Sequence, residues 1–110
     1  SSIAGIDPGL LGGMIYSAVK SAVINFTGFL NEEFKNTGIR ASVVIPGEVD
    51  TPLIDKRPVV PDSEARKLMV SAEDVAEAIT LIAKLPMKSN IPKMIIRPSF
   101  TRDMSEIKEV

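Results

Sequence analysis

A tyrosine and a lysine stand four residues apart in this sequence, at Tyr16 and Lys20. On a helix, positions i and i+4 share one face, so the ammonium group can sit beside the phenol. A free tyrosine has a pKa of about 10 and is a poor acid or base at neutral pH, but a nearby positive charge favours the phenolate. The pair therefore suits proton transfer, although any helix with a tyrosine and several lysines can show this spacing by chance.

The composition draws attention to this pair because other common catalytic groups are missing. The 110 residues include no His, no Cys and one Tyr. This excludes a Ser-His-Asp triad, a cysteine nucleophile, disulfides and the common zinc sites, so no metal site is expected. Proton chemistry must then use Asp, Glu, Lys or Tyr16. The absence of Cys also fits a reducing compartment, and we expect a cytoplasmic protein.

Two further segments carry groups that could contact a ligand. Ser2 lies 14 residues before Tyr16, and its hydroxyl could hydrogen-bond a substrate carbonyl or alkoxide, or merely belong to a turn. Residues 46–51 follow an apolar run, and their backbone groups and Thr hydroxyl could hold a carboxamide, or form a plain turn. Ligands of open α/β sheets bind beyond the carboxyl ends of strands, which is where this segment would lie.

The glycines before the tyrosine indicate a loop over residues 1–13 that forms no helix or strand. Gly9, Gly12 and Gly13 do not form a dinucleotide fingerprint, because that motif needs a strand before it and a phosphate-cradling helix after it. With Pro8, they would instead let the loop approach a substrate.

The elements that must position these groups alternate between helix and strand. A helix is predicted over residues 14–36 and a buried parallel strand over residues 39–45. A second helix, capped by Ser71, is predicted to reach about Lys84, and a second strand covers residues 94–97. The first helix places apolar side chains on one face, namely Val19, Val23, Phe26, Leu30 and Phe34.

This order indicates an α/β protein, but an incomplete one. Two parallel strands do not make a stable sheet, since three or more are normally needed. We therefore expect residues 1–110 to be part of a single domain, with a preceding segment supplied by the same or another chain. Residues 48–70 are predicted to be irregular, with one short helix starting near Asp62, and the tail 99–110 is polar without a clear period.

Taken in order, these motifs resemble the short-chain dehydrogenase/reductase family. Ser-Ser-Ile-Ala-Gly begins the chain, Tyr-Ser-Ala-Val-Lys heads the long predicted helix, and Pro-Gly-Glu-Val-Asp-Thr-Pro follows the buried strand. The later Glu-Asp-Val-Ala helix start and the Ile-Ile-Arg-Pro strand also fit. Order, spacing and structural context match over nearly the whole chain.

The resemblance implies a Rossmann-type doubly wound parallel sheet, of which this chain is the C-terminal, catalytic and substrate-side half. It also implies NAD or NADP as cofactor, and hydride transfer between a secondary alcohol and a carbonyl. Ser2 would polarise the carbonyl, Tyr16 would be the general acid or base, and Lys20 would favour the phenolate and hold the nicotinamide ribose. The cofactor would contact Tyr16, Lys20, Pro46, Gly47, Val49 and Thr51.

The partners implied are a small alcohol or carbonyl substrate and a second copy of the chain. A homodimer or homotetramer would form through the helix 14–36, where small residues allow close packing. With a net charge of −1 and no apolar run long enough to span a bilayer, neither nucleic acid nor membrane is expected. The small residues are Ser17, Ala18, Ser21 and Ala22. A different set of residues would line an apolar substrate pocket or else belong to the core, namely Met14, Ile15, Leu53, Ile54, Leu68 and Met69.

The sequence departs from the family pattern in two respects. Val19 precedes the lysine where Ser is common, which changes little. Family members are also much longer, and their phosphate loop, their NAD-or-NADP selector and their catalytic Asn lie in the missing part. Residues 1–110 alone are therefore not expected to bind a dinucleotide well. The alternative is a non-catalytic binding or assembly module that keeps the fold, against which the intact Ser2, Tyr16 and Lys20 argue.

Overall fold

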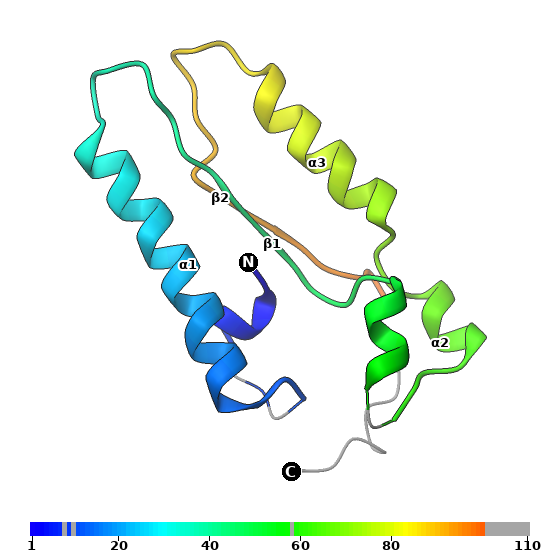
Figure 1. Ribbon diagram of the computed structural model, residues 1–110. Coiled ribbons are helices and arrows are strands. Elements are labelled where there is room, and N and C mark those ends of the chain that lie inside the picture. The colour runs from blue at the N-terminus through cyan, green and yellow to red at the C-terminus, as the bar shows by residue number, and fades with distance from the viewer. Residues whose placement is uncertain (8, 10, 58, 101–110) are drawn as a thin grey trace.

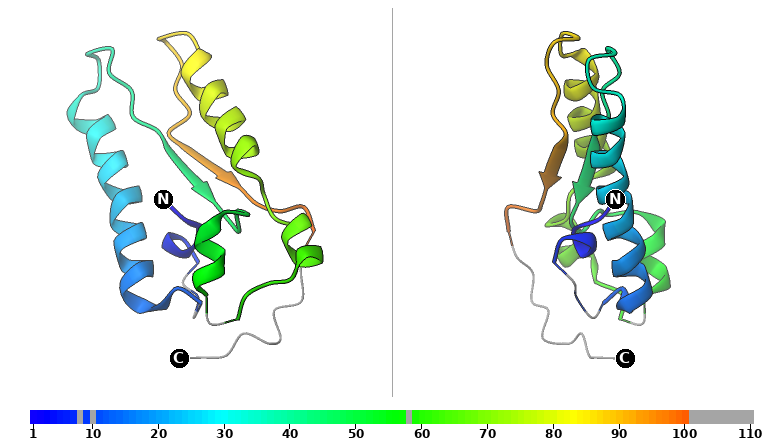
Figure 2. Two further views of the ribbon diagram at one scale, coloured as in Figure 1. Left: turned by 45° about the vertical axis from the view of Figure 1, so that its right-hand side comes forward. Right: turned by 90° about the vertical axis from the view of Figure 1, so that its left-hand side faces the viewer.

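Two parallel strands lie between two long helices in the computed structural model, which describes residues 1–7, 9, 11–57 and 59–100 (Figure 1). Strand β1 pairs with β2 in parallel, with Val43 opposite Lys93 and Pro46 opposite Ile96. Figures 1 and 2 show α1 on one side of the strands and α3 on the other. The predicted α/β class is confirmed. The elements in order are η1 Ile3–Gly5, α1 Gly13–Glu33, β1 Val43–Pro46, η2 Pro52–Lys56, α2 Ser63–Lys67, α3 Ala72–Lys84 and β2 Lys93–Ile96.

Helix α1 is three residues shorter at its C-terminal end than predicted, because Asn36 and Gly38 take left-handed backbone conformations with φ of 66° and 89°. Its inward side buries Thr27, and the side chain of Asn31 exchanges two hydrogen bonds with the backbone of Ala41. Of the five apolar side chains of the predicted face, only Leu30 is half-buried, and the other four are exposed. Val19 is 54% exposed and Phe26 is 60% exposed. A helix that is apolar on more than one side has further partners to meet.

Strand β1 begins at Val43, four residues later than predicted. The prediction that residues 39–42 belong to the strand is therefore wrong. Ile39 is exposed, and the Arg40 guanidinium reaches across to the carbonyls of Pro86 and Ser89, at 3.2 and 2.7 Å. These bonds fasten the segment to the far loop instead of to a strand. Val43 and Ile45 are buried, while the alternate residues are only half-buried, so burial is complete on one face of β1. Strand β2 is displaced by one residue from the prediction.

The loop before α1 contains the short helix η1, which the glycine-rich composition did not predict. Its N-cap is Ser2, whose hydroxyl oxygen accepts a hydrogen bond from the Ala4 amide at 3.2 Å. Such capping by Ser is ordinary and satisfies an otherwise unpaired amide. Pro8 and Leu10 lie outside the described residues, as do residues 101–110 of the predicted polar tail.

Residues 50–69, the excursion, leave the sheet after β1 and return to it. At the neck of this loop Asp50 N donates to Val70 O at 2.9 Å and Val70 N donates to Glu48 O at 3.0 Å. Ile54 and Met69 are buried within it. The short helix expected near Asp62 is confirmed as α2, whose first turn is capped by the Asp62 carboxylate. The 3-10 helix η2 was not predicted.

Helix α3 begins where the sequence predicted, because Ser71 and Asp74 cap each other reciprocally. The Ser71 hydroxyl accepts from the Asp74 amide at 3.1 Å, and the Asp74 carboxylate accepts from the Ser71 amide at 2.9 Å. These bonds satisfy two amides that the helix itself leaves free. Across the residues that the structure describes, no helix is long and apolar enough to cross a membrane.

Candidate active site

Tyr16 and Lys20 lie in the first two turns of α1, with the ammonium group close to the aromatic ring. The Lys20 Nζ atom is 5.5 Å from the centroid of the Tyr16 ring. That distance is within the range of a cation–π attraction, which holds the two side chains on one face of the helix. Tyr16 is 41% exposed, so its ring is open to a ligand.

The position of the Tyr16 ring depends on the missing side chain of Gly12, and the sequence analysis did not predict this contact. A Cβ atom on Gly12 would stand 2.5 Å from Cδ1 of Tyr16. Any larger residue would therefore push the ring aside. A glycine at the N-cap of the helix, four residues before the candidate tyrosine, could have indicated this, because the two positions meet across the first turn.

The loop that carries Ser2 is seated directly on the backbone of α1 beside Lys20. The Ser1 hydroxyl donates to the Lys20 carbonyl at 2.7 Å, and the Ser17 hydroxyl donates to the Ala4 carbonyl. A Cβ atom on Gly5 would lie 2.7 Å from the Lys20 carbonyl carbon. Only glycine permits so close an approach of two backbones. Sequence reasoning missed Gly5, because no local pattern shows which distant backbone it meets.

The three expected catalytic residues are thus only partly brought together. Tyr16 and Lys20 are in contact, and the loop of Ser2 touches the backbone of Lys20. Among the residues that the structure describes, no hydrogen bond joins Ser2 to Tyr16. The Ser2 hydroxyl instead caps η1.

The expected cofactor-binding turn, residues 46–51, lies at the carboxyl end of β1. In Figure 1 this end of the strands and the N-terminal end of α1 lie at the same end of the molecule. Gly47 N donates to Ile96 O at 2.8 Å, and a Cβ atom on Gly47 would be 3.3 Å from Cδ of Pro98, so the turn closes over β2. Thr51 is the N-cap of η2, but its side chain makes no capping bond. These groups are compatible with a ligand at the carboxyl edge of the sheet.

Two arginines attach the excursion to this turn. Arg57 Nη1 lies 3.1 Å from Oε1 of Glu48, and both side chains are largely shielded. Arg66 contacts Asp50, Thr51 and Asp55. Hydrogen bonds to the two aspartates raise the pKa of the Arg66 guanidinium above its ordinary value. The sequence reasoning missed both arginines, because their partners lie on other elements.

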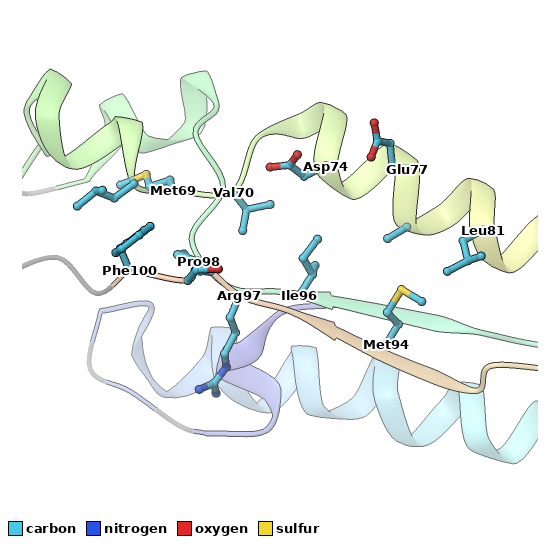
Figure 3. A pocket seen from close by; sticks show the side chains of 13 residues that line it. Met69, Val70, Asp74, Glu77, Leu81, Met94, Ile96, Arg97, Pro98 and Phe100 are labelled. Atoms are coloured by element: carbon cyan, nitrogen blue, oxygen red, sulfur yellow. The ribbon is translucent and has the colours of Figure 1, made fainter.

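The six residues expected to line an apolar pocket, or else to belong to the core, lie in different environments. Ile54 is core, and Met69 is buried at the rim of a hollow of about 580 Å³ between α3 and β2 (Figure 3). Leu68 lines the same hollow, with Asp74 and Glu77 on its α3 side. A second hollow, between η1 and α1, includes Met14. Ile15 and Leu53 are exposed. Sequence neighbours of a site need not share its surface.

The family model and the sequence relatives that match this chain are described as dehydrogenases or oxidoreductases. A family model described as short chain dehydrogenase matches residues 1–59. An uncharacterized oxidoreductase of Staphylococcus haemolyticus is 34% identical over 84 residues, which is 76% of this chain and 34% of that protein. Another from Staphylococcus epidermidis is 30% identical over 98 residues, which is 89% of this chain and 40% of that protein. The chain therefore spans between about a third and two-fifths of the length of these relatives.

A solved structure shows the same arrangement of elements. The closed form of serine dehydrogenase complexed with NADP+ matches with a TM-score of 0.79 and 28% sequence identity. The match covers 94% of this chain and 44% of that one. The expected fold, part of a Rossmann-type parallel sheet, is confirmed.

Proposed function

The chain belongs to the short-chain dehydrogenase family, and on this premise we propose that the full protein is an NAD(P)-dependent oxidoreductase. It would interconvert a secondary alcohol and a carbonyl by hydride transfer. Residues 1–110 would supply its catalytic and substrate-side half. The observation that carries this proposal is the contact of Lys20 Nζ with the Tyr16 ring, 5.5 Å from its centroid, beside an exposed phenol.

The proposed roles follow from the chemistry of each side chain. The nicotinamide supplies or accepts the hydride when it is bound. Tyr16 would give its phenolic proton to the substrate oxygen during reduction and remove the hydroxyl proton during oxidation. The Lys20 ammonium would favour the phenolate that reduction leaves behind. Ser2 would donate its hydroxyl proton to the same substrate oxygen, and it can do so while its oxygen accepts from the Ala4 amide.

The residues present fit a nicotinamide nucleotide. Tyr16 and Lys20 offer donors for ribose hydroxyls, and the turn of Pro46, Gly47, Val49 and Thr51 offers backbone groups and a hydroxyl not engaged in capping η2. The solved relative holds NADP+. For this chain we propose a nicotinamide cofactor without assigning NAD or NADP, because the residues that select between them would precede Ser1.

We propose that the N-terminal half adds a strand beside β1. Ser1 N donates to the Val44 carbonyl at 2.9 Å, so chain arriving at Ser1 would run along the edge of β1. A third strand there would complete a sheet that two strands cannot stabilise alone. This supports the proposal that residues 1–110 form part of one larger domain.

A second copy of the chain is the proposed partner of the outward side of α1. Phe26 and Phe29 are both 60% exposed there, next to Ala18 and Ala22, which would let another helix approach. We propose a homodimer or homotetramer through this helix, in the cytoplasm. Ser17 does not belong to the surface, because it is hydrogen-bonded to η1.

Tyr16→Phe in the full-length protein tests the proposal. Loss of the acid and base should lower kcat by about a hundredfold or more, while NADH or NADPH still binds. Carbonyl reduction at a near wild-type rate by the Phe variant would show that Tyr16 does not carry the proton. If the wild-type protein binds neither nucleotide, the non-catalytic assembly module becomes the better explanation.

A further inference from the structure

The guanidinium of Arg66, on α2, makes three hydrogen bonds to two other segments. Nε donates to Oδ1 of Asp50 at 2.8 Å, and Nη2 donates to the carbonyl of Thr51 at 3.2 Å, both in the turn after β1. Nη1 donates to Oδ1 of Asp55 in η2 at 2.7 Å. The Arg66 side chain therefore connects α2 both to the turn after β1 and to η2.

The planar fork of arginine suits this arrangement in a way that lysine does not. The three nitrogens point in fixed directions and reach separate acceptors, whereas an ammonium group is a point charge without that geometry. The Arg66 side chain is 24% exposed and its partners Asp50 and Asp55 are 44% and 59% exposed, so solvent reaches these ion pairs chiefly from the aspartate side. Hydrogen bonds between charged groups are also shorter and stronger than neutral ones.

Within the described part of the excursion, Arg66 is the main link between the Thr51 end of the turn and α2. The bridge between Val49 and Val70 fixes the neck as far as the Asp50 amide. Beyond it, the Thr51 carbonyl accepts from Ile54 within the same short helix, and the Thr51 side chain makes no capping bond. Arg66 connects this carbonyl to α2.

We propose that Arg66 is a positioning residue that holds the Thr51 turn in the shape that receives the nicotinamide, and thereby sets the affinity for the nucleotide. This inference rests on the proposed function, because the contact of Thr51 with the cofactor is part of that proposal. Arg66 acts through Thr51 and need not touch substrate or cofactor.

The experiment compares Arg66→Met with Lys67→Met in the full-length protein. Lys67 is the next residue of α2, and its ammonium pairs with Glu64 at 2.9 Å within that helix, so it is a matched loss of charge without contact to the turn. Arg66→Met should raise the Kd for NADH or NADPH about tenfold, as expected for lost charged hydrogen bonds. At saturating nucleotide kcat should change less than about twofold, and Lys67→Met should leave Kd unchanged.

Two further readouts separate positioning from general destabilisation. Amide hydrogen exchange over residues 46–56 of the nucleotide-free protein should become faster in Arg66→Met and stay unchanged in Lys67→Met. In a double-mutant cycle, Arg66→Met should weaken nucleotide binding less in a Thr51→Ala background, because the two act as a unit.

The outcomes distinguish the two proposals. Equal Kd values and equal exchange in Arg66→Met and Lys67→Met would overturn the role of Arg66 and leave the proposed function standing. Fully additive effects with Thr51→Ala would overturn it as well. If the wild-type protein binds neither nucleotide, both the proposed function and the role of Arg66 fail.

Discussion

Two loops lie beside the proposed active site, and each is held there by different physical means. One is the loop of η1, which packs on α1, and the other is the excursion, which is attached to the turn after β1. In the first, two backbones touch, and Gly5 has no room for a Cβ atom beside Lys20. In the second, Arg57 and Arg66 reach carboxylates on other segments.

The two kinds of contact should respond differently to mutation and to solvent. Close packing depends on shape, so it is sensitive to an added methyl group and insensitive to salt. Partly exposed ion pairs are weaker and are screened by ions. The η1 loop beside Tyr16 and Lys20 is therefore held chiefly by close packing and hydrogen bonds to backbone, with one ion pair from Arg97 to Asp7 at its end, whereas the proposed cofactor turn is held chiefly by ion pairs.

Gly5→Ala should have the largest effect on stability. Its new methyl group would stand 2.7 Å from the backbone of Lys20, and backbone cannot move aside like a flexible side chain. We expect a loss of about 3 kcal/mol in the free energy of unfolding, at the upper end for overpacking. Denaturant unfolding of the full-length protein measures it.

Gly28→Ala is the matched control for this prediction. Gly28 is inside α1, and a Cβ atom there would meet nothing within 4 Å. Replacing it should stabilise the helix by about 1 kcal/mol, from propensity alone. If Gly5→Ala proves as harmless as Gly28→Ala, η1 is not seated on α1 as described.

Gly12→Ala should act on catalysis more than on stability. Its methyl group would meet the Tyr16 ring at 2.5 Å, and the ring can turn away to relieve the clash. A displaced phenol should lower kcat about tenfold, since small misplacements of reacting groups are costly. Gly9→Ala is the control, because a Cβ atom there meets nothing within 4 Å. Equal kcat values for the two variants would show that Gly12 does not position the ring.

The parts of this structure that the sequence predicted are those set by local interactions. The start of α3 follows from Ser71 and Asp74, three residues apart, and the contact of Tyr16 with Lys20 follows from one helical turn. The start of β1 was predicted too early, because residues 39–42 are held by Arg40 through bonds to the distant Pro86 and Ser89. Such bonds leave no periodic signal.

The same distinction explains what was missed in the candidate site. Gly5 and Arg66 matter through the atoms they meet, and those atoms lie on other elements of the fold. The side of α1 that packs inward was equally hidden, since the helix is apolar on more than one side. Family resemblance pointed to the proposed reacting residues but not to the residues that support them.

Ser71→Ala should destabilise the protein by about 1 kcal/mol, as usual for the loss of an N-cap.

Hydrogen bonds from the Ser71 amide and hydroxyl lower the pKa of Asp74. The stabilisation from Asp74 is therefore present above the ordinary aspartate pKa and is lost as pH falls through its lowered value. The difference in Tm between wild type and Asp74→Asn should shrink in acid. A difference that is constant with pH would mean that the carboxylate does not cap the helix through its charge.

Arg57→Met should have the smallest effect and show most directly how the two contacts differ. The pair with Glu48 is 3.1 Å long, with 25% and 20% of the side chains exposed, so its loss should cost about 1 kcal/mol or less. Because ions screen such pairs, the difference in unfolding free energy from wild type should fall as salt is raised. The cost of Gly5→Ala should not change over the same series. If the costs of both substitutions fall with salt, charge also holds η1 in place, and the contrast between the two regions is wrong.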